Sequence, residues 1–175
     1  MTTIRDVDSL LAILASPDAT DDGEGVTMLA HHLQTAAQLA VDAPDDLALQ
    51  VAGLVHDVGT ILEPGCPLTH ARTGADVVRP LLGDRVAELV LQHDQAKRYL
   101  VTVAPAYLDQ LSAQSVATLE VQGGPMDAET RASFERLPDF AACVALRRAD
   151  DAAKIPGKDV PALEHWRAAL TTLGA

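Results

Sequence analysis

The stretch Leu47–Gly59, LALQVAGLVHDVG, guides the interpretation of the whole chain. Its first nine residues are almost all apolar and lack strand-like alternation, which predicts a buried helix. His56 and Asp57 follow at the end of this helix, and Gly59 then breaks it. An imidazole nitrogen and a carboxylate oxygen at one helix end suit iron, manganese or zinc. The segment therefore predicts a helical core and a candidate metal site beside it.

Outward from this segment, apolar residues recur at helical spacing in blocks that Gly, Pro and Asp separate. Thr60–Thr69 and Glu120–Met126 are the longest irregular stretches, and neither resembles a domain linker. With 175 residues and a hydrophobic share of 48%, the chain is predicted to be one all-α helical bundle domain, 1–175. The expected helical blocks are 4–15, 25–41, 45–58, 70–82, 84–101, 127–136, 138–153 and 161–172.

The composition narrows the classes of function. A formal net charge of −12 repels nucleic-acid backbones and anionic membranes, and no basic run offsets it. The first residues lack a signal-peptide pattern and no segment is apolar enough to span a membrane, so we expect a cytoplasmic protein. We expect no nucleic-acid or membrane partner, and no obligate protein partner is evident. Cys66 and Cys143 are too few and too far apart for a disulfide framework or a thiolate zinc site.

Further His and Asp residues extend the doublet into an ordered series. Each of them lies within a predicted helix or at its end, so a compact bundle can bring them together. Asp57 is the natural bridge between two metal ions because it offers two oxygens. Helical spacing leaves open which member of each adjacent pair is the ligand. The additional members are His31 or His32, His70, His93, and Asp150 or Asp151.

The series and four longer motifs resemble the HD superfamily, which includes metal-dependent phosphohydrolases and a smaller set of di-iron oxygenases. The greatest likeness is to the mixed-valent di-iron oxygenases that cleave the carbon–phosphorus bond of α-hydroxyphosphonates. A plain phosphohydrolase is not expected to carry the AKRYL and QGGPM segments. The motifs, which span about residues 20–155, are GEGVTMLAHHLQ at 23–34, HDQAKRYL at 93–100, QGGPM at 122–126 and RRADD at 147–151.

The resemblance implies which residues hold the metals. It places an acid seven positions before the first ligand, as Glu24 stands before His31, and an Arg three positions before the last, as Arg147 stands before Asp150. One ferrous and one ferric ion are implied, with O2 as co-substrate. The ligands of one iron would be His31, His56, Asp57 and Asp150, and those of the other would be Asp57, His70 and His93.

The resemblance also implies a small anionic organophosphonate substrate, from which phosphate and a carboxylic acid are released. Lys97 and Arg147 stand one turn from proposed ligands and would supply the cations that a phosphonate dianion needs, while Ser115 adds a hydroxyl donor. Glu24 could pair with a cationic group of the substrate.

Two positions depart from the family pattern. Asp21 and Thr60 stand where the family has a Tyr and a His that serve amine-type substrates. The sequence therefore predicts that an amino-hydroxyethyl substrate is poor and that a smaller or differently substituted hydroxyphosphonate is better.

Two rival functions use the same residues. A metal-dependent phosphohydrolase would generate a hydroxide at the same ligands and bind a phosphate ester through the same cations. A binding or regulatory module would use the site to sense a ligand or to stabilise the fold. The complete ligand set counts against a module, because a degenerate site is expected to have lost ligands.

Overall fold

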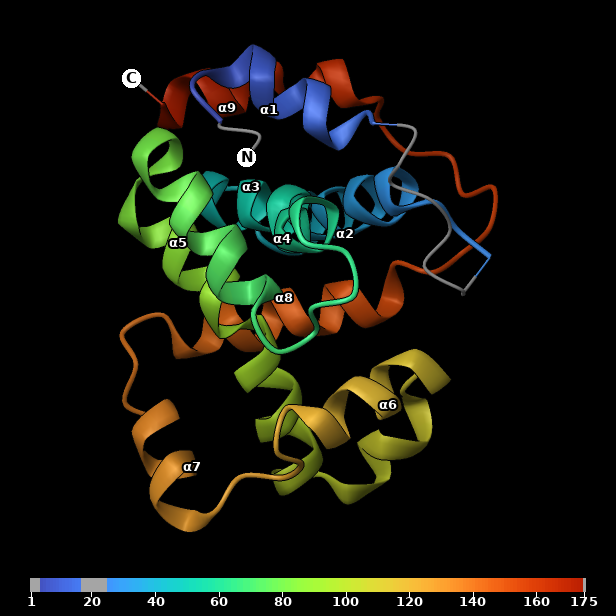
Figure 1. Ribbon diagram of the computed structural model, residues 1–175, viewed down its shortest axis with the longest axis vertical. Coiled ribbons are helices and arrows are strands. Elements are labelled where there is room, and N and C mark those ends of the chain that lie inside the picture. The colour runs from blue at the N-terminus through green and yellow to red at the C-terminus, as the bar shows by residue number, and fades with distance from the viewer. Residues whose placement is uncertain (1–3, 17–24, 175) are drawn as a thin grey trace.

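The computed structural model describes residues 4–16 and 25–174, and Figure 1 shows the arrangement of its helices. This described part contains helices and no β-sheet, so the all-α prediction is confirmed. The elements are α1 (Val7–Leu14), α2 (Met28–Asp42), α3 (Leu47–Val55), α4 (Val58–Leu62), α5 (His70–Val103), η1 (Pro105–Gln110), α6 (Ala113–Val121), α7 (Ala128–Phe134), α8 (Phe140–Ala152), η2 (Leu163–Trp166) and α9 (Arg167–Leu173).

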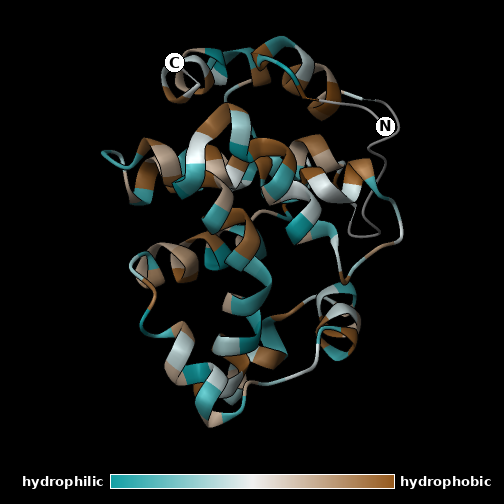
Figure 2. Ribbon diagram, turned by 60° about the vertical axis from the view of Figure 1, so that its left-hand side comes forward, coloured by the Kyte–Doolittle hydropathy of each residue, from teal (hydrophilic) through white to brown (hydrophobic). Residues whose placement is uncertain are grey.

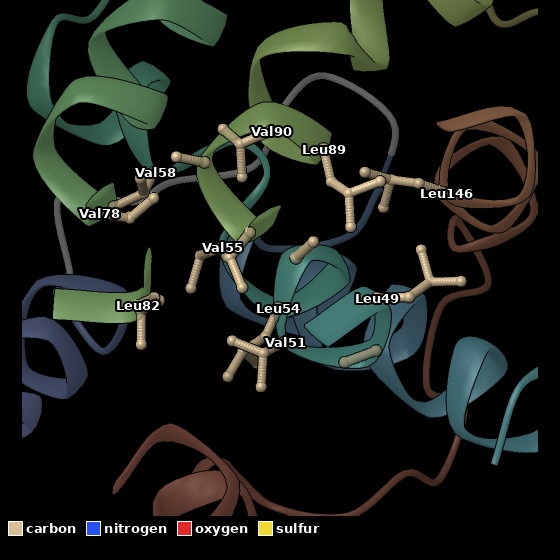
Figure 3. Packing of buried hydrophobic residues seen from close by; sticks show 14 of the residues in the cluster. Leu49, Val51, Leu54, Val55, Val58, Val78, Leu82, Leu89, Val90 and Leu146 are labelled. Carbon is tan, nitrogen blue, oxygen red and sulfur yellow. The ribbon is translucent and has the colours of Figure 1, made fainter. Parts of the chain in front are cut away.

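The apolar segment Leu47–Val55 forms the central helix, α3. α3 packs against α2, α5 and α8, while α1 and α9 cover one side of this group (Figure 1). Val51, Leu54 and Val55 of α3 are fully buried, in a cluster that also contains residues of α5 and α8 (Figure 3). This apolar packing fixes α3, so the His–Asp doublet at its end is held in a defined place.

Hydrophilic residues share the outer helices with hydrophobic ones, as expected where one face of a helix packs and the other meets water (Figure 2). None of the described helices combines the length and the apolar character needed to span a bilayer. Within the described residues, Cys143 is buried and Cys66 is exposed, and both are free thiols.

The helix that spans 70–103 joins two of the predicted blocks. Gly83 interrupts it with a positive φ of 83°, so the predicted break between 82 and 84 lies at a kink rather than at a loop. Pro80 stands just before the kink. The second half of α5 contacts η1, α6 and α7, and this extension forms the lower part of the molecule in Figure 1.

The helical segments between 105 and 121 were not predicted from the sequence. The two elements, η1 and α6, are only six and nine residues long, so their periodic signal extends over too few turns to stand out, but local capping starts α6 nonetheless. The Ser112 side chain accepts a hydrogen bond from the backbone N–H of Ser115 at 3.1 Å, which begins α6. The irregular stretches are also shorter than expected, because α4 extends to Leu62 and α6 to Val121.

Gly59 lets α4 approach the start of α5. A Cβ at this position would overlap the His70 carbonyl oxygen and lie 2.8 Å from the Gly74 backbone nitrogen. Since backbone atoms cannot move aside as a side-chain tip can, we expect Gly59→Ala to lower the free energy of unfolding by about 3 kcal/mol, at the upper end for overpacking. Urea denaturation measures this change.

Gly53→Ala is the matched control for this prediction. A Cβ there would lie 2.6 Å from the Cδ1 atom of Leu39, which is the end of a flexible side chain. We expect a clearly smaller loss, and equal losses in the two variants would contradict the close approach at Gly59.

Candidate metal centre and substrate cavity

Three helices bring one cluster of metal-binding side chains together. His31 comes from α2, His56 from the end of α3 and Asp150 from the last turn of α8. The Nε2 atoms of His31 and His56 lie 3.1 Å apart, and Asp150 Oδ1 lies 3.2 Å and 3.8 Å from them. All three residues are buried. Such spacing lets the three atoms share one ion.

A second cluster lies on the other side of Asp57. His70 begins α5 and His93 stands more than six turns later on the same kinked helix, yet their Nε2 atoms are 3.1 Å apart. Asp57 Oδ1 lies 3.4 Å from each of these nitrogens. These three residues could also hold an ion.

Asp57 joins the two clusters through its two oxygens. Oδ1 faces His70 and His93, whereas Oδ2 lies 3.5 Å from His56 Nε2 and 3.9 Å from His31 Nε2. This is the arrangement expected of a carboxylate that bridges two ions.

Backbone carbonyls orient the four imidazoles. Each Nδ1 atom lies within hydrogen-bond distance of a backbone carbonyl oxygen. The four pairs are His31–Ala153 at 3.0 Å, His56–Gly53 at 2.9 Å, His70–Pro67 at 3.0 Å and His93–Val90 at 2.6 Å. A carbonyl only accepts, so each Nδ1 carries the proton and donates it. The Nε2 lone pairs then face the two clusters, as metal-binding histidines require. The donor set and its orientation therefore fit two metal ions.

The carboxylates of the site are ionised at neutral pH. Burial by itself would raise the pKa of Asp57, but the neighbouring imidazoles, His56 first among them, hold it well below its ordinary value. For Asp150, burial is likewise outweighed, mainly by the guanidinium of Arg147, and its pKa is also well below the ordinary value. Carboxylates that stay charged in buried or half-buried positions favour cations in the site.

The two clusters open into one cavity of about 500 Å³. Lys97, Ser115 and Arg147 line the same cavity, so the structure brings together the three residues predicted to bind phosphonate. Lys97 Nζ donates to Thr118 Oγ1 at 2.7 Å, and Arg147 Nη2 lies 3.4 Å from Ser115 Oγ. The same cavity is therefore lined by metal-binding atoms and by cations with neighbouring hydroxyls.

Sequence reasoning missed Lys154, a third cation of this cavity. Its Nζ donates to Ser112 Oγ at 3.2 Å and Ser115 Oγ at 3.3 Å. It lies two residues beyond the end of α8 at Ala152, so helical spacing alone could not place it in the site. Its serine partners could not have been found, because the helix that carries them was not predicted.

The adjacent residues take other environments. Both ring nitrogens of His32 are buried without a hydrogen-bond partner among the described residues, and its ring packs edge-on against His56. Asp151 pairs with Arg147 and accepts a hydrogen bond from the Tyr107 hydroxyl. Thr60 lines the cavity. Glu24 and Asp21 lie outside the described residues, and the roles assigned to all the site residues stay predictions.

Comparison with known proteins identifies the family. The family model of the HD domain matches residues 27–128 of this chain. This chain belongs to the HD-domain family. The match begins at the N-cap of α2 and ends at the start of α7, so it includes His31, His56, Asp57, His70 and His93. Asp150 of this HD protein lies beyond the matched residues.

Two similar relatives of this HD protein are named as phosphonate dioxygenases. The hydroxymethylphosphonate dioxygenase of Gimesia maris is 36% identical over 91% of this chain and 84% of the relative. The [1-hydroxy-2-(trimethylamino)ethyl]phosphonate dioxygenase of Leisingera caerulea, described as glycine-betaine-forming, is 34% identical over 82% of this chain and 76% of the relative. An uncharacterized protein of Acanthamoeba polyphaga mimivirus is 31% identical over 83% of this chain and 70% of the relative. The predicted resemblance is confirmed, and the chain is an enzyme of the oxygenase type.

Proposed function

We propose that this chain uses two iron ions and O2 to cleave the carbon–phosphorus bond of a small α-hydroxyphosphonate. The C–P bond breaks, the hydroxyl-bearing carbon is oxidised to a carboxylic acid, and O2 is reduced and supplies the two added oxygen atoms. Phosphate is the second product. The observation that carries the proposal is the single cavity in which two His/Asp clusters face Lys97, Ser115 and Arg147. The relatives' names support the same reaction class.

The two clusters supply the proposed ligand sets. When bound, one ferrous and one ferric ion would supply Lewis acidity, and the ferrous ion an electron for O2 activation, while the substrate is the net reductant. One ion would be held by His31, His56, Asp57 and Asp150, and the other by Asp57, His70 and His93. Backbone carbonyls and helix packing fix the orientation of each imidazole.

The cations of the cavity are proposed to bind and orient the phosphonate. Arg147 is held by its ion pair with Asp150, 2.7 Å from Nη1 to Oδ2, and its Nη2 faces Ser115. A phosphonate bound by Lys97, Ser115 and Arg147 would direct its α-hydroxyl toward the two clusters. Holding the substrate in this way lowers the entropy cost of reaching the reactive arrangement. Lys154 would add a further positive charge at the serine side of the cavity.

The substrate is proposed to be small. Thr60 lines the cavity where the family pattern has a His, and Asp21 replaces the Tyr, so the groups that serve amine-type substrates are absent. Glu24 is still proposed to face a cationic substituent where one is present. Hydroxymethylphosphonate, the substrate in the name of the Gimesia maris relative, is therefore the first compound to test.

The test is a panel of hydroxyphosphonates and phosphate monoesters, assayed with iron-loaded protein in air and under strict anaerobiosis. We expect phosphate and formate from hydroxymethylphosphonate only when O2 is present, with O2 consumed in equal amount. We expect slower turnover of the amino-hydroxyethyl compound. Phosphate release from monoesters without O2, and none from any hydroxyphosphonate in air, would instead identify a phosphohydrolase.

Lys97 predicts a pH dependence of substrate binding. Burial, and then the nearby Arg147, lower the pKa of Lys97 to about 8. A lysine binds a dianion only when protonated, so the contribution is present below that pKa and is lost as the pH rises through it. A charged hydrogen bond contributes about 1.5–3 kcal/mol, so we expect KM to rise at least about tenfold between roughly pH 7 and 9.5. Steady-state kinetics with the phosphonate substrate measures this rise.

Lys97→Arg is the control for this pH dependence. Arginine stays protonated over the same pH range, so the rise in KM should disappear while metal content is unchanged. A rise in KM of the same size in Lys97→Arg would show that another group titrates.

A further inference from the structure

A second His–Asp doublet stands inside the site. His93 and Asp94 are adjacent on α5, as His56 and Asp57 are adjacent at the end of α3. The His93 Nε2 atom lies 3.6 Å from Asp94 Oδ1, and the His56 Nε2 atom lies 3.5 Å from Asp57 Oδ2. The two doublets thus place a carboxylate at nearly the same distance from the metal-facing nitrogen of the preceding histidine.

Asp94 lies on the metal-facing side of both imidazoles of the second cluster. Its Oδ2 is 3.7 Å from His70 Nε2, in addition to the 3.6 Å between Oδ1 and His93 Nε2. The opposite nitrogens of both rings are turned to backbone carbonyls. Atoms that share one ion through bonds of about 2.1 Å lie roughly 3–4 Å apart. The Asp94 oxygens fall in that range from both Nε2 atoms.

A bound cation would stabilise the Asp94 carboxylate in its surroundings. Its side chain is 10% exposed and lines the cavity. Among the described residues, the basic side chains found within 4 Å of its oxygens are those two imidazoles. A buried carboxylate is costly unless it is paired or coordinates a metal. Because the two nitrogens present lone pairs to a metal, an ion between them would satisfy the imidazoles and the carboxylate together.

We propose that Asp94 is a further carboxylate ligand of the ion held by Asp57, His70 and His93, an inference that rests on the two-ion site of the proposed function. With Asp94, each ion has two imidazoles, the bridging Asp57 and one carboxylate of its own. The second ion is then bound by as many protein groups as the first. Asp94 in this role strengthens binding of the second ion and adds negative charge beside it.

A simpler role for Asp94 is to offset the charge of Lys97, which stands one turn later on α5. Lys97 already donates to Thr118, and Asp94 faces the imidazoles at 3.6–3.7 Å. The two roles differ in what they do to metal binding. A ligand changes the affinity of the second ion, whereas a partner of Lys97 changes substrate binding and leaves both ions in place.

The experiment is a titration of the metal-free full chain with Co²⁺, without substrate, followed by visible absorption and by metal analysis after gel filtration. Asp94→Asn is compared with the native sequence and with Asp76→Asn, the same change at an exposed position of α5. We expect two bound ions for the native chain and for Asp76→Asn. In Asp94→Asn we expect the second ion to bind at least tenfold more weakly and the first to be unaffected. Asp94→Glu, which keeps a carboxylate, should retain more of the second ion than Asp94→Asn.

The outcomes separate this inference from the proposed function. Two ions bound with native affinity in Asp94→Asn would overturn the ligand role of Asp94 and leave the two-ion site intact. A single ion in the native chain would overturn the two-ion site itself. Circular dichroism of each variant verifies that a loss of metal does not come from loss of the fold.

Discussion

Asp57→Ala is expected to deplete both metal ions and to lower the rate of phosphate release by at least about a thousandfold. One Asp57 oxygen faces His70 and His93 and the other lies 3.5 Å from His56, so one substitution removes a ligand atom from each cluster. A bound metal supplies several kcal/mol of transition-state stabilisation, and each 1.36 kcal/mol corresponds to about a factor of ten in rate. Metal analysis of the purified variant and a phosphate-release assay measure the two effects.

Asp45→Ala is the matched control, since Asp45 is an exposed acid near the start of α3. It should keep two ions and native activity. If Asp57→Ala keeps both ions, then the carboxylate does not bridge them and the proposed site is wrong. If it loses a single ion, Asp57 is a terminal ligand of that ion only.

Parts of the site that depend on local sequence could be predicted. The doublet follows an apolar helix that packing fixes, and His70 begins the next long helix after a Pro- and Gly-containing loop, as expected. The residue series and its motifs then predicted the remaining ligands, whose side chains the structure brings together in two clusters. Such predictions succeed because helix ends are set by residues only a few positions away.

The choice within each adjacent pair could not be derived from spacing. Neighbouring residues of a helix point in directions about 100° apart, so the rotation of α8 about its axis decides which acid enters the site. Packing sets that rotation: Asp150 Oδ1 lies 3.2 Å from His31 Nε2, while Asp151 binds Arg147 and Tyr107. Tyr107 comes from η1, a segment that the sequence analysis did not predict as helical. Its distance from Asp151 in the chain explains why no local pattern revealed this pair.

His31→Ala is expected to deplete the ion of the first cluster and to abolish turnover, whereas substitution of the adjacent His32 is expected to spare both. His31 Nε2 lies 3.1 Å from His56 Nε2 and 3.2 Å from Asp150 Oδ1, so its loss removes one ligand from that cluster. Burial lowers the pKa of His32 well below its ordinary value, so this ring is neutral, and neither nitrogen has a hydrogen-bond partner among the described residues. The ring therefore contributes packing. Metal content and phosphate release measure the contrast.

Two substitutions of His32 distinguish a role of this ring in packing from a role in metal binding or catalysis. Leucine nearly refills the volume of the ring and needs no hydrogen bond, so His32→Leu should keep two ions, native activity and a free energy of unfolding close to that of the native chain. His32→Ala leaves a cavity beside His56 and should lower the free energy of unfolding by about 2 kcal/mol while its metal content is retained. If His32→Leu loses an ion and His31→Ala retains it, then His32 is the ligand and His31 contributes packing. That result would mean that α2 presents its other face to the site when metal is bound.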